Sequence, residues 1–239
     1  MNKLDLSIIV PAYNEEKSIR KSITNLLDVF KKSQISFELI IINDGSQDNT
    51  LEIIEKFKAI YSEYNIYVLN NKKNLGKSAS LNKGFKIAKG NFTTIHDADL
   101  EYNPTDLLKM FNFFKEKSHL DSIYGSRYLD KNKPIKQKKI YYLANMFNLK
   151  LFNFLFNAKL TDLHSCYKIF KTNVLKEFDL KEKKFGFELE VSILLIKNKL
   201  KIHELHISYQ ARSKSSGKKI SFLDEINFLI TILKFRFFR

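Results

Sequence analysis

Short apolar runs alternate with helix-spaced apolar stripes along the first 95 residues. The runs at 6–10, 37–42, 66–69 and 91–95 are rich in β-branched residues, as in strands buried on both faces. Stripes with helical period predict helices over about 17–30, 51–61 and 77–89. Pro11 is expected to end the first strand. This alternation predicts an α/β fold, a mostly parallel, Rossmann-like sheet flanked by helices that holds ligands at the carboxyl ends of its strands.

Polar turns follow three of the predicted strands. They are Tyr13-Asn14-Glu15, Asn43-Asp44-Gly45-Ser46 and Asp97-Ala98-Asp99. Because the carboxyl ends of parallel strands meet at one edge of a sheet, we expect these turns to form one polar site on a rigid scaffold.

The third turn carries a candidate metal site. In an extended chain, residues two apart point to the same side, so Asp97, Asp99 and Glu101 would present three carboxylates to one point. Hard oxygen ligands of this kind suit Mg²⁺ or Mn²⁺, which bind through one or two carboxylates plus substrate phosphates. The plain alternative for so short a triplet is a solvated acidic turn that closes the strand.

Composition excludes several classes. The 239 residues are 44% hydrophobic and include one cysteine, Cys166, so no internal disulfide is expected. We find no signal peptide and no apolar run long enough for a transmembrane helix. No Gly-x-Gly-x-x-Gly follows the first strand, and Gly76-Lys77-Ser78 lacks the upstream glycine of a phosphate loop. A dinucleotide dehydrogenase and a P-loop NTPase are therefore set aside.

The net charge of +15 is concentrated near two segments. Basic residues crowd 129–139 and recur over 212–219, where a solvated loop and a phosphate-binding or membrane-contacting surface are both open interpretations. Aromatic and aliphatic residues dominate 140–160 and 220–239. These two segments are either core helices or amphipathic helices at a membrane interface, and basic residues among the aromatics at 233–239 favour the interface.

Eight motifs in order make the chain resemble the family 2 glycosyltransferases, and within them the dolichol-phosphate mannose synthase-like, polyprenyl-phosphate branch. The resemblance covers about residues 5–225. The motifs are Val10-Pro11-Ala12-Tyr13-Asn14-Glu15, Ile42-Asn43-Asp44-Gly45-Ser46, Asn74-Leu75-Gly76-Lys77, Asp97-Ala98-Asp99-Leu100-Glu101-Tyr102, Gly125-Ser126-Arg127-Tyr128, Thr161 to Lys168, Phe185-Gly186-Phe187-Glu188, and Tyr209 to Arg212 with Gly217-Lys218-Lys219. The sequence departs from the family pattern at Asn43, where a second aspartate is usual, and at His96, where glutamine is frequent.

The resemblance implies a GT-A fold that transfers a sugar, with inversion, from a nucleoside-diphosphate donor of the GDP-mannose or UDP-glucose type. The implied donor-site residues are Pro11, Tyr13, Glu15, Ile42, Asp44, Gly76, Lys77, Asp97, Ala98, Asp99, Arg127 and Glu188. The implied metal ligands for Mg²⁺ or Mn²⁺ are Asp97, Asp99 and Glu101. Catalysis would depend on Asp99, Arg127, Arg212 and Lys218, because a departing diphosphate needs cations around it.

The acceptor is the open question. A lipid phosphate is already anionic and needs only cations, for which Lys136, Lys138, Lys139, Arg212 and Lys218 are candidates. We therefore expect a polyprenyl (undecaprenyl or dolichyl) phosphate acceptor and a peripheral enzyme on the anionic surface of the cell membrane, at its cytoplasmic face. The domain would span 1–219, with an interfacial helix over 220–239.

Two other hypotheses stay open at this point. A sugar hydroxyl acceptor would need a base, for which Asp162 is the candidate. A basic nucleic-acid-binding module is the alternative from another class, and we expect no nucleic acid because Asp97 and Asp99 would repel phosphates without a metal.

Overall fold

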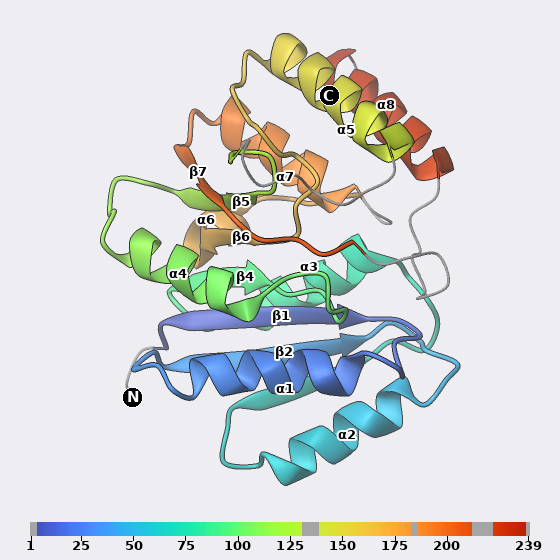
Figure 1. Ribbon diagram of the computed structural model, residues 1–239, viewed down its shortest axis with the longest axis vertical. Coiled ribbons are helices and arrows are strands. Elements are labelled where there is room, and N and C mark those ends of the chain that lie inside the picture. The colour runs from blue at the N-terminus through green and yellow to red at the C-terminus, as the bar shows by residue number, and fades with distance from the viewer. Residues whose placement is uncertain (1–3, 131–138, 183–185, 212–221, 238–239) are drawn as a thin grey trace.

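The computed structural model describes residues 4–130, 139–182, 186–211 and 222–237. Its centre is a seven-stranded sheet with the order β3-β2-β1-β4-β6-β5-β7 (Figure 1). The strands are β1 (Leu6–Ala12), β2 (Phe37–Asn43), β3 (Ile66–Asn70), β4 (Phe92–Ile95), β5 (Ser122–Ser126), β6 (Lys168–Lys171) and β7 (Ile202–His206). Only β6 runs antiparallel to its neighbours β4 and β5. The predicted mostly parallel α/β sheet is confirmed.

The first four strands follow the predicted positions, with one correction at Pro11. The first strand does not end there, because β1 continues to Ala12 and pairs with β2 over its whole length. The Ala12 carbonyl accepts a hydrogen bond from the Asp44 N–H on the β2 side, so Pro11, one residue earlier, faces the other neighbour. On that side the pairing with β4 ends at Ile9. The missing N–H of Pro11 therefore costs no ladder hydrogen bond.

Helices cover both faces of the sheet. On one face lie α1 (Ile19–Phe30), α2 (Thr50–Ile60) and α4 (Pro104–Lys115), and on the other α3 (Lys77–Ile87), α6 (Thr172–Glu177) and α7 (Phe187–Lys197) (Figure 1). In α1 the buried apolar residues repeat with helical spacing and pack on the sheet, while α7 is apolar nearly all round and is buried along most of its length. The core is continuous between the two helical layers.

Two long helices pack side by side at the β5–β7 end of the molecule. They are α5 (Lys139–Phe156) and α8 (Phe222–Phe237), and α8 also contacts α7 (Figure 1). The inner side of α8 is buried at Phe228, Ile232 and Phe235. The two segments predicted as apolar helices thus form a pair docked on the body, and the predicted domain boundary at 219/220 stays a prediction. No helix in the described part of the chain is long and apolar enough to span a bilayer.

Candidate active site

The three polar turns come together as the sequence predicts. They follow β2, β1 and β4, which are neighbours in the sheet and parallel to one another. Each turn brings a buried carboxylate to this edge: Asp44 after β2, Glu15 after β1 and Asp99 after β4. Three acidic groups so close to one sheet edge are typical of a site that receives cations or the donor groups of a ligand.

Asp44 fixes the loop that leads into α3. Its carboxylate accepts hydrogen bonds from the N–H groups of Leu75 (3.0 Å) and Gly76 (2.8 Å) and from the side-chain amide of Asn71 (2.7 Å). Gly76, at the start of α3, has a φ of +92°, which favours glycine. The predicted donor residues Asp44 and Gly76 are therefore in direct contact, and Asp44 organises this loop.

The turn after β2 leaves no room for a side chain at Gly45. Its φ is +69°, and a Cβ there would lie 2.5 Å from the Lys73 carbonyl carbon. Asn43, the departure from the family pattern, donates its side-chain amide to the Asn70 side-chain oxygen at 2.7 Å. Asn43 thereby ties the end of β2 to the end of β3, where the two residues are also paired in the sheet.

Lys77 joins two acidic residues that the sequence places 91 residues apart. Its ammonium lies 2.9 Å from Asp97 Oδ1 and 2.9 Å from Glu188 Oε1. Burial alone would lower the pKa of Lys77, but the two carboxylates outweigh it and raise the pKa well above its ordinary value. Burial likewise opposes ionisation of Asp97, but Lys77 and a hydrogen bond from the Cys166 thiol lower its pKa. Three predicted donor-site residues, Lys77, Asp97 and Glu188, therefore meet at one point.

Glu190, two residues after Glu188, has a different role. Its carboxylate accepts hydrogen bonds from the backbone N–H groups of Lys181 and Glu182 and stabilises that loop. Of these two glutamates, it is Glu188, the implied donor-site residue, whose carboxylate contacts Lys77.

The predicted convergence of Asp97, Asp99 and Glu101 is not observed. Asp97 contacts Lys77, whereas Glu101 Oε2 accepts a hydrogen bond from the Tyr209 hydroxyl at 2.8 Å. Asp99 Oδ1 accepts the backbone N–H of Glu101 at 3.0 Å, so the chain turns here and does not continue as an extended strand. Among the residues that the structure describes, no group of three His, Cys, Asp or Glu side chains could hold a metal ion. The assumption of an extended chain was wrong.

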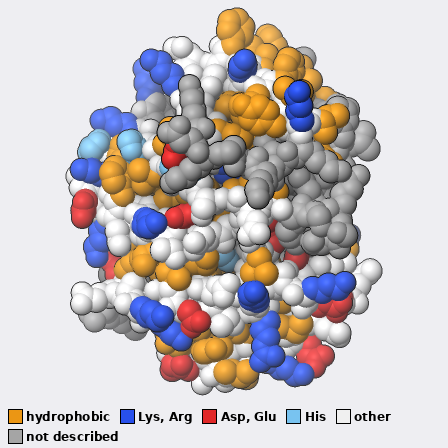
Figure 2. Space-filling view, in the orientation of Figure 1, with side chains coloured by type: hydrophobic (Ala, Val, Ile, Leu, Met, Phe, Trp, Pro, Cys, Tyr) orange, Lys and Arg blue, Asp and Glu red, His pale blue; other side chains and the backbone are white. Residues whose placement is uncertain are grey.

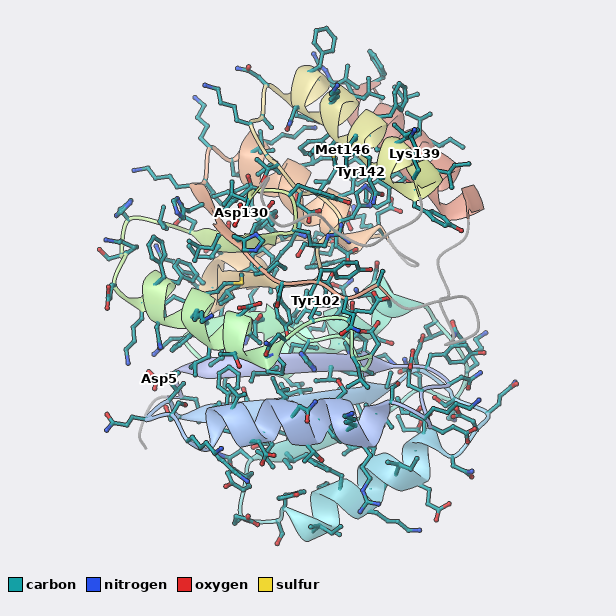
Figure 3. All side chains as sticks on the ribbon, viewed as in Figure 1. Asp5, Tyr102, Asp130, Lys139, Tyr142 and Met146 are labelled. Carbon is teal, nitrogen blue, oxygen red and sulfur yellow. The ribbon has the colours of Figure 1, made fainter. Side chains whose placement is uncertain are left out.

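Glu101 instead anchors the segment that follows β7. Besides the bond from Tyr209, its carbonyl accepts the Gln210 N–H at 2.9 Å. Tyr102 forms an isolated bridge with Tyr209, and Tyr102 lies at the centre of the molecule in Figure 3. This segment leads to residues 212–221, which are outside the described residues together with the predicted phosphate-binding residues Arg212 and Lys218.

Arg127 is held rigidly by Asp162. The guanidinium donates from Nε (2.7 Å) and Nη2 (2.9 Å) to the two carboxylate oxygens, and the backbone N–H of Arg127 adds a third bond. The guanidinium also lies 4.9 Å from the ring centroid of Tyr209 and 5.3 Å from that of Tyr128. Burial would raise the pKa of Asp162, but Arg127 outweighs it and lowers the pKa.

This arrangement bears on Asp162 as a candidate base. Its side chain is fully buried, and both oxygens are occupied by Arg127. A base needs a carboxylate within reach of the acceptor hydroxyl, so the geometry of the described residues argues against this alternative. The role that fits Asp162 is to position Arg127.

The remaining predicted residues lie near the carboxyl ends of the strands, on α5, or outside the described residues. Glu15 accepts a hydrogen bond from the Ser18 hydroxyl at 2.5 Å, and its backbone N–H donates to Thr50 Oγ1 at 2.8 Å. Pro11 and Ile42 pair with each other one residue before β1 and β2 end. Tyr13 is half-buried, and Ala98 is buried within the third turn. Lys139, exposed, begins α5 (Figure 3), whereas Lys136 and Lys138 are outside the described residues.

Sequence reasoning missed several residues that support this site. Tyr209 links Glu101 to Arg127, and Glu204 accepts the backbone N–H groups of Thr161 and Asp162. Cys166, considered in the sequence only as the single cysteine, is buried, and its thiol donates a hydrogen bond that helps to lower the pKa of Asp97. These contacts join segments far apart in the chain, so no local pattern signals them.

Comparison with known proteins identifies the family. The model of the glycosyl transferase family 2 matches residues 7–179, which is most of the chain and includes β1–β6. The chain belongs to glycosyl transferase family 2. It is an enzyme, a glycosyltransferase that takes its sugar from a nucleotide sugar.

Relatives from other organisms extend this finding. An uncharacterised protein of Methanocaldococcus jannaschii is 28% identical over 84% of this chain and 86% of its own length. The dolichyl-phosphate beta-glucosyltransferase ALG5D of Trichomonas vaginalis is 25% identical over 98% of this chain and 73% of its own.

A solved structure supports the fold. Glucosyl-3-phosphoglycerate synthase of Mycobacterium tuberculosis, solved in complex with Mn²⁺, UDP and phosphoglyceric acid, superposes with a TM-score of 0.69 at 17% identity. The match covers 98% of this chain and 78% of that one. It confirms the predicted GT-A fold.

The turn after β4 carries two carboxylates of the kind that bind a divalent cation, Asp97 and Asp99. Asp97 is already paired with the ammonium of Lys77, so a cation at Asp97 would have to displace Lys77 or share the carboxylate with it. Mg²⁺ in such enzymes is bound by one or two carboxylates together with substrate phosphates. Asp97 and Asp99 are therefore candidates for a metal that arrives with the diphosphate, whereas Glu101 is engaged by Tyr209.

Proposed function

We propose that this glycosyltransferase moves a hexose, with inversion, from a nucleoside-diphosphate sugar to a polyprenyl phosphate at a membrane surface, with Mg²⁺ or Mn²⁺. Support for a UDP-sugar comes from the neighbours solved with UDP and, for TarS of Staphylococcus aureus, with UDP-GlcNAc. The similarity to a dolichyl-phosphate glucosyltransferase over nearly the whole chain supports a polyprenyl phosphate acceptor.

The observation that carries the acceptor is an apolar surface on the α5–α8 pair. Each helix leaves a stripe of large apolar side chains exposed at spacings of three, four and seven residues. We call this set the α5–α8 apolar stripes: Ile140, Leu143, Phe147 and Phe154 of α5, and Ile230, Leu233 and Phe237 of α8. In Figure 2 hydrophobic side chains gather at the upper end of the molecule, over these two helices.

Exposed basic residues accompany the stripes. Lys139 and Lys150 lie on α5, and Lys234 and Arg236 on α8. Large apolar side chains beside Lys and Arg on an exposed helix are typical of a helix at the headgroup level of a bilayer. If the acceptor were a small soluble molecule, the apolar side chains of the stripes would have no apolar surface to pack against. Binding to the anionic surface of the cell membrane, at its cytoplasmic face, is part of the proposal.

In the proposed reaction the residues at the sheet edge have distinct tasks. Asp97 and Asp99 would hold the metal, which when bound supplies positive charge to the departing diphosphate. Lys77 is a second cation at the same place, aligned by Glu188. Arg127, locked by Asp162, provides a fixed donor for the phosphate of the acceptor or of the donor. Since a phosphate acceptor is already an anion, no base is needed and the engagement of Asp162 is no obstacle.

The test is donor turnover with a panel of nucleotide sugars, with and without metal and polyprenyl phosphate. We expect sugar in the lipid phase only when metal and lipid phosphate are both present, with UDP-glucose among the donors used. Equal transfer to a soluble saccharide without lipid would rule out the proposed lipid phosphate acceptor, but it would not change the assignment to the family.

A matched pair of variants tests the metal site in the same assay. Asp99→Asn removes one charge at the site, and Asp28→Asn does so on the exposed end of α1, where Asp28 contacts Lys31. Asp99→Asn should lower turnover by about 100-fold or more, as removal of one preorganised charge contact does elsewhere. Asp28→Asn should have no effect, and near-normal activity of Asp99→Asn would exclude the metal assignment.

A further inference from the structure

A buried histidine directly precedes the acidic turn that is proposed to hold the metal. His96 follows β4 and is almost fully buried. Its Nε2 lies 2.9 Å from Ser22 Oγ on α1, and its Nδ1 lies 3.0 Å from the Tyr167 hydroxyl. The Ser22 hydroxyl lies 2.9 Å from the carbonyl oxygen of Asp99 and 3.3 Å from that of Asp97.

The chemistry of these atoms fixes the direction of every hydrogen bond. A carbonyl oxygen only accepts, so Ser22 must direct its single proton toward the Asp97–Asp99 turn. Ser22 Oγ then has only lone pairs for His96, so Nε2 must carry a proton and donate it. When the imidazole is neutral, Nδ1 accepts the proton of the Tyr167 hydroxyl. The chain runs from Tyr167 to His96 to Ser22 to the backbone of Asp99.

We infer that His96, with a proton on Nε2, is a positioning residue that holds the Asp97–Asp99 turn in place through Ser22. It does not touch a substrate or a metal. Its effect is to keep the Ser22 proton directed at the turn, which fixes the two carbonyl groups and thereby the direction of the carboxylate of Asp99. The inference rests on the proposed function only in naming Asp99 as the residue that is positioned.

A ring contact also holds the imidazole. The His96 and Tyr167 rings are stacked, with centroids 5.9 Å apart and an interplanar angle of 29°, which restricts rotation of the imidazole. A buried polar chain whose members are all satisfied specifies one arrangement.

The tautomer itself gives the first test. In ¹⁵N-labelled protein the two imidazole nitrogens have separate chemical shifts, and His96 is assigned by loss of its signals in His96→Gln. We expect a proton on Nε2 at pH 7. An Nε2 without a proton would overturn the inference whatever the acceptor of the enzyme proves to be.

Matched variants test the positioning role through binding of Mn²⁺ and UDP, without any acceptor. A glutamine side chain offers an amide donor and a carbonyl acceptor in place of Nε2–H and Nδ1, whereas phenylalanine fills the space and offers neither. His96→Gln should keep both dissociation constants within about threefold of wild type, and His96→Phe should raise them about tenfold or more, as loss of such supporting contacts does at metal sites.

Two more variants keep the test valid if His96→Phe fails to fold. Ser22→Ala removes only a hydroxyl and should also weaken Mn²⁺ and UDP binding about tenfold. His203→Gln changes an exposed histidine on β7 that stacks on Phe113, and should change nothing. Wild-type binding by Ser22→Ala would overturn the inference. Failure of the enzyme to use lipid phosphate, with these binding results intact, would instead count against the proposed function.

Discussion

At the scale of single residues, the site is built from charges that satisfy one another before any substrate binds. Lys77 pairs with both Asp97 and Glu188, and Arg127 pairs with Asp162. Such pairs fix the position of each charge, because a buried ion that lost its partner would carry a large desolvation cost. When a substrate brings a diphosphate and a cation, these side chains can change partners without moving far. Binding then need not order flexible side chains.

Lys77 gives the first prediction at this scale. Lys77→Met leaves Asp97 and Glu188 facing each other without a cation, so unfolding free energy should fall by about 2 kcal/mol, less than for a fully buried pair because Lys77 is 15% exposed. UDP affinity should fall in parallel. Denaturant melts and UDP titrations measure the two effects. The double variant Lys77→Met/Glu188→Gln removes the excess charge and should recover part of the stability but not the UDP affinity. If UDP binds the single variant normally, Lys77 is not a donor-site residue.

The pair of Arg127 and Asp162 predicts a pH dependence. The pKa of Asp162 is lower in the folded protein than in the unfolded chain, so the pair contributes stability above the unfolded value. That contribution is lost as the pH falls through the folded pKa. Asp162→Asn should therefore be less stable than wild type at pH 7, and the difference should shrink below about pH 4, where the unfolded carboxyl becomes protonated. Urea melts from pH 7 to pH 3 measure it. A difference that stays constant with pH would show that lost packing, and not the ion pair, causes the destabilisation.

At the scale of elements, the sequence predicts the sheet edge well and the contacts across it poorly. Strand runs, helical stripes and polar turns over residues 6–101 are local patterns, and they located β1–β4, α1–α3 and the three turns. Glu101 was misplaced because its partner, Tyr209, is 108 residues away. Asp162 stayed open as a candidate base because nothing near it in sequence indicates that Arg127 occupies both of its oxygens.

Two isoleucines on opposite sides of α8 predict different effects of the same substitution. Ile232 is fully buried, whereas Ile230 is 56% exposed and belongs to the α5–α8 apolar stripes. Ile232→Glu should cost several kcal/mol of stability, since it buries a charge without a partner. Ile230→Glu should leave the thermal midpoint nearly unchanged and weaken binding to vesicles of anionic lipid. Thermal melts and vesicle sedimentation separate the two effects. Unchanged sedimentation of Ile230→Glu together with Phe154→Glu would show that the stripes do not contact the membrane.

At the scale of the whole molecule, the proposed acceptor and the proposed donor enter at different places. The donor edge is formed by the ends of β1, β2 and β4, whereas the α5–α8 apolar stripes lie on the pair of helices beyond β5 and β7 (Figure 1). Tyr209 and Arg127 connect these regions, because Arg127 follows β5, Tyr209 follows β7, and Glu101 binds Tyr209 from the donor side. A lipid whose chain stays in the bilayer could thus present its phosphate to a donor held at the sheet.

The net charge of +15 and the apolar stripes together predict how the affinity for a bilayer depends on salt. If attraction between Lys/Arg and anionic lipid acted alone, binding would nearly vanish at about 1 M salt, where the Debye length is about 3 Å. Burial of the apolar stripes is not screened in this way. We therefore expect vesicle affinity to fall with salt to a plateau above zero, and Phe154→Glu, at an 83% exposed position, to lower that plateau while leaving the slope nearly unchanged. Sedimentation with anionic and with neutral vesicles over a salt series measures both terms. Complete release at high salt would mean that the stripes remain outside the bilayer and that the protein is held by charge alone.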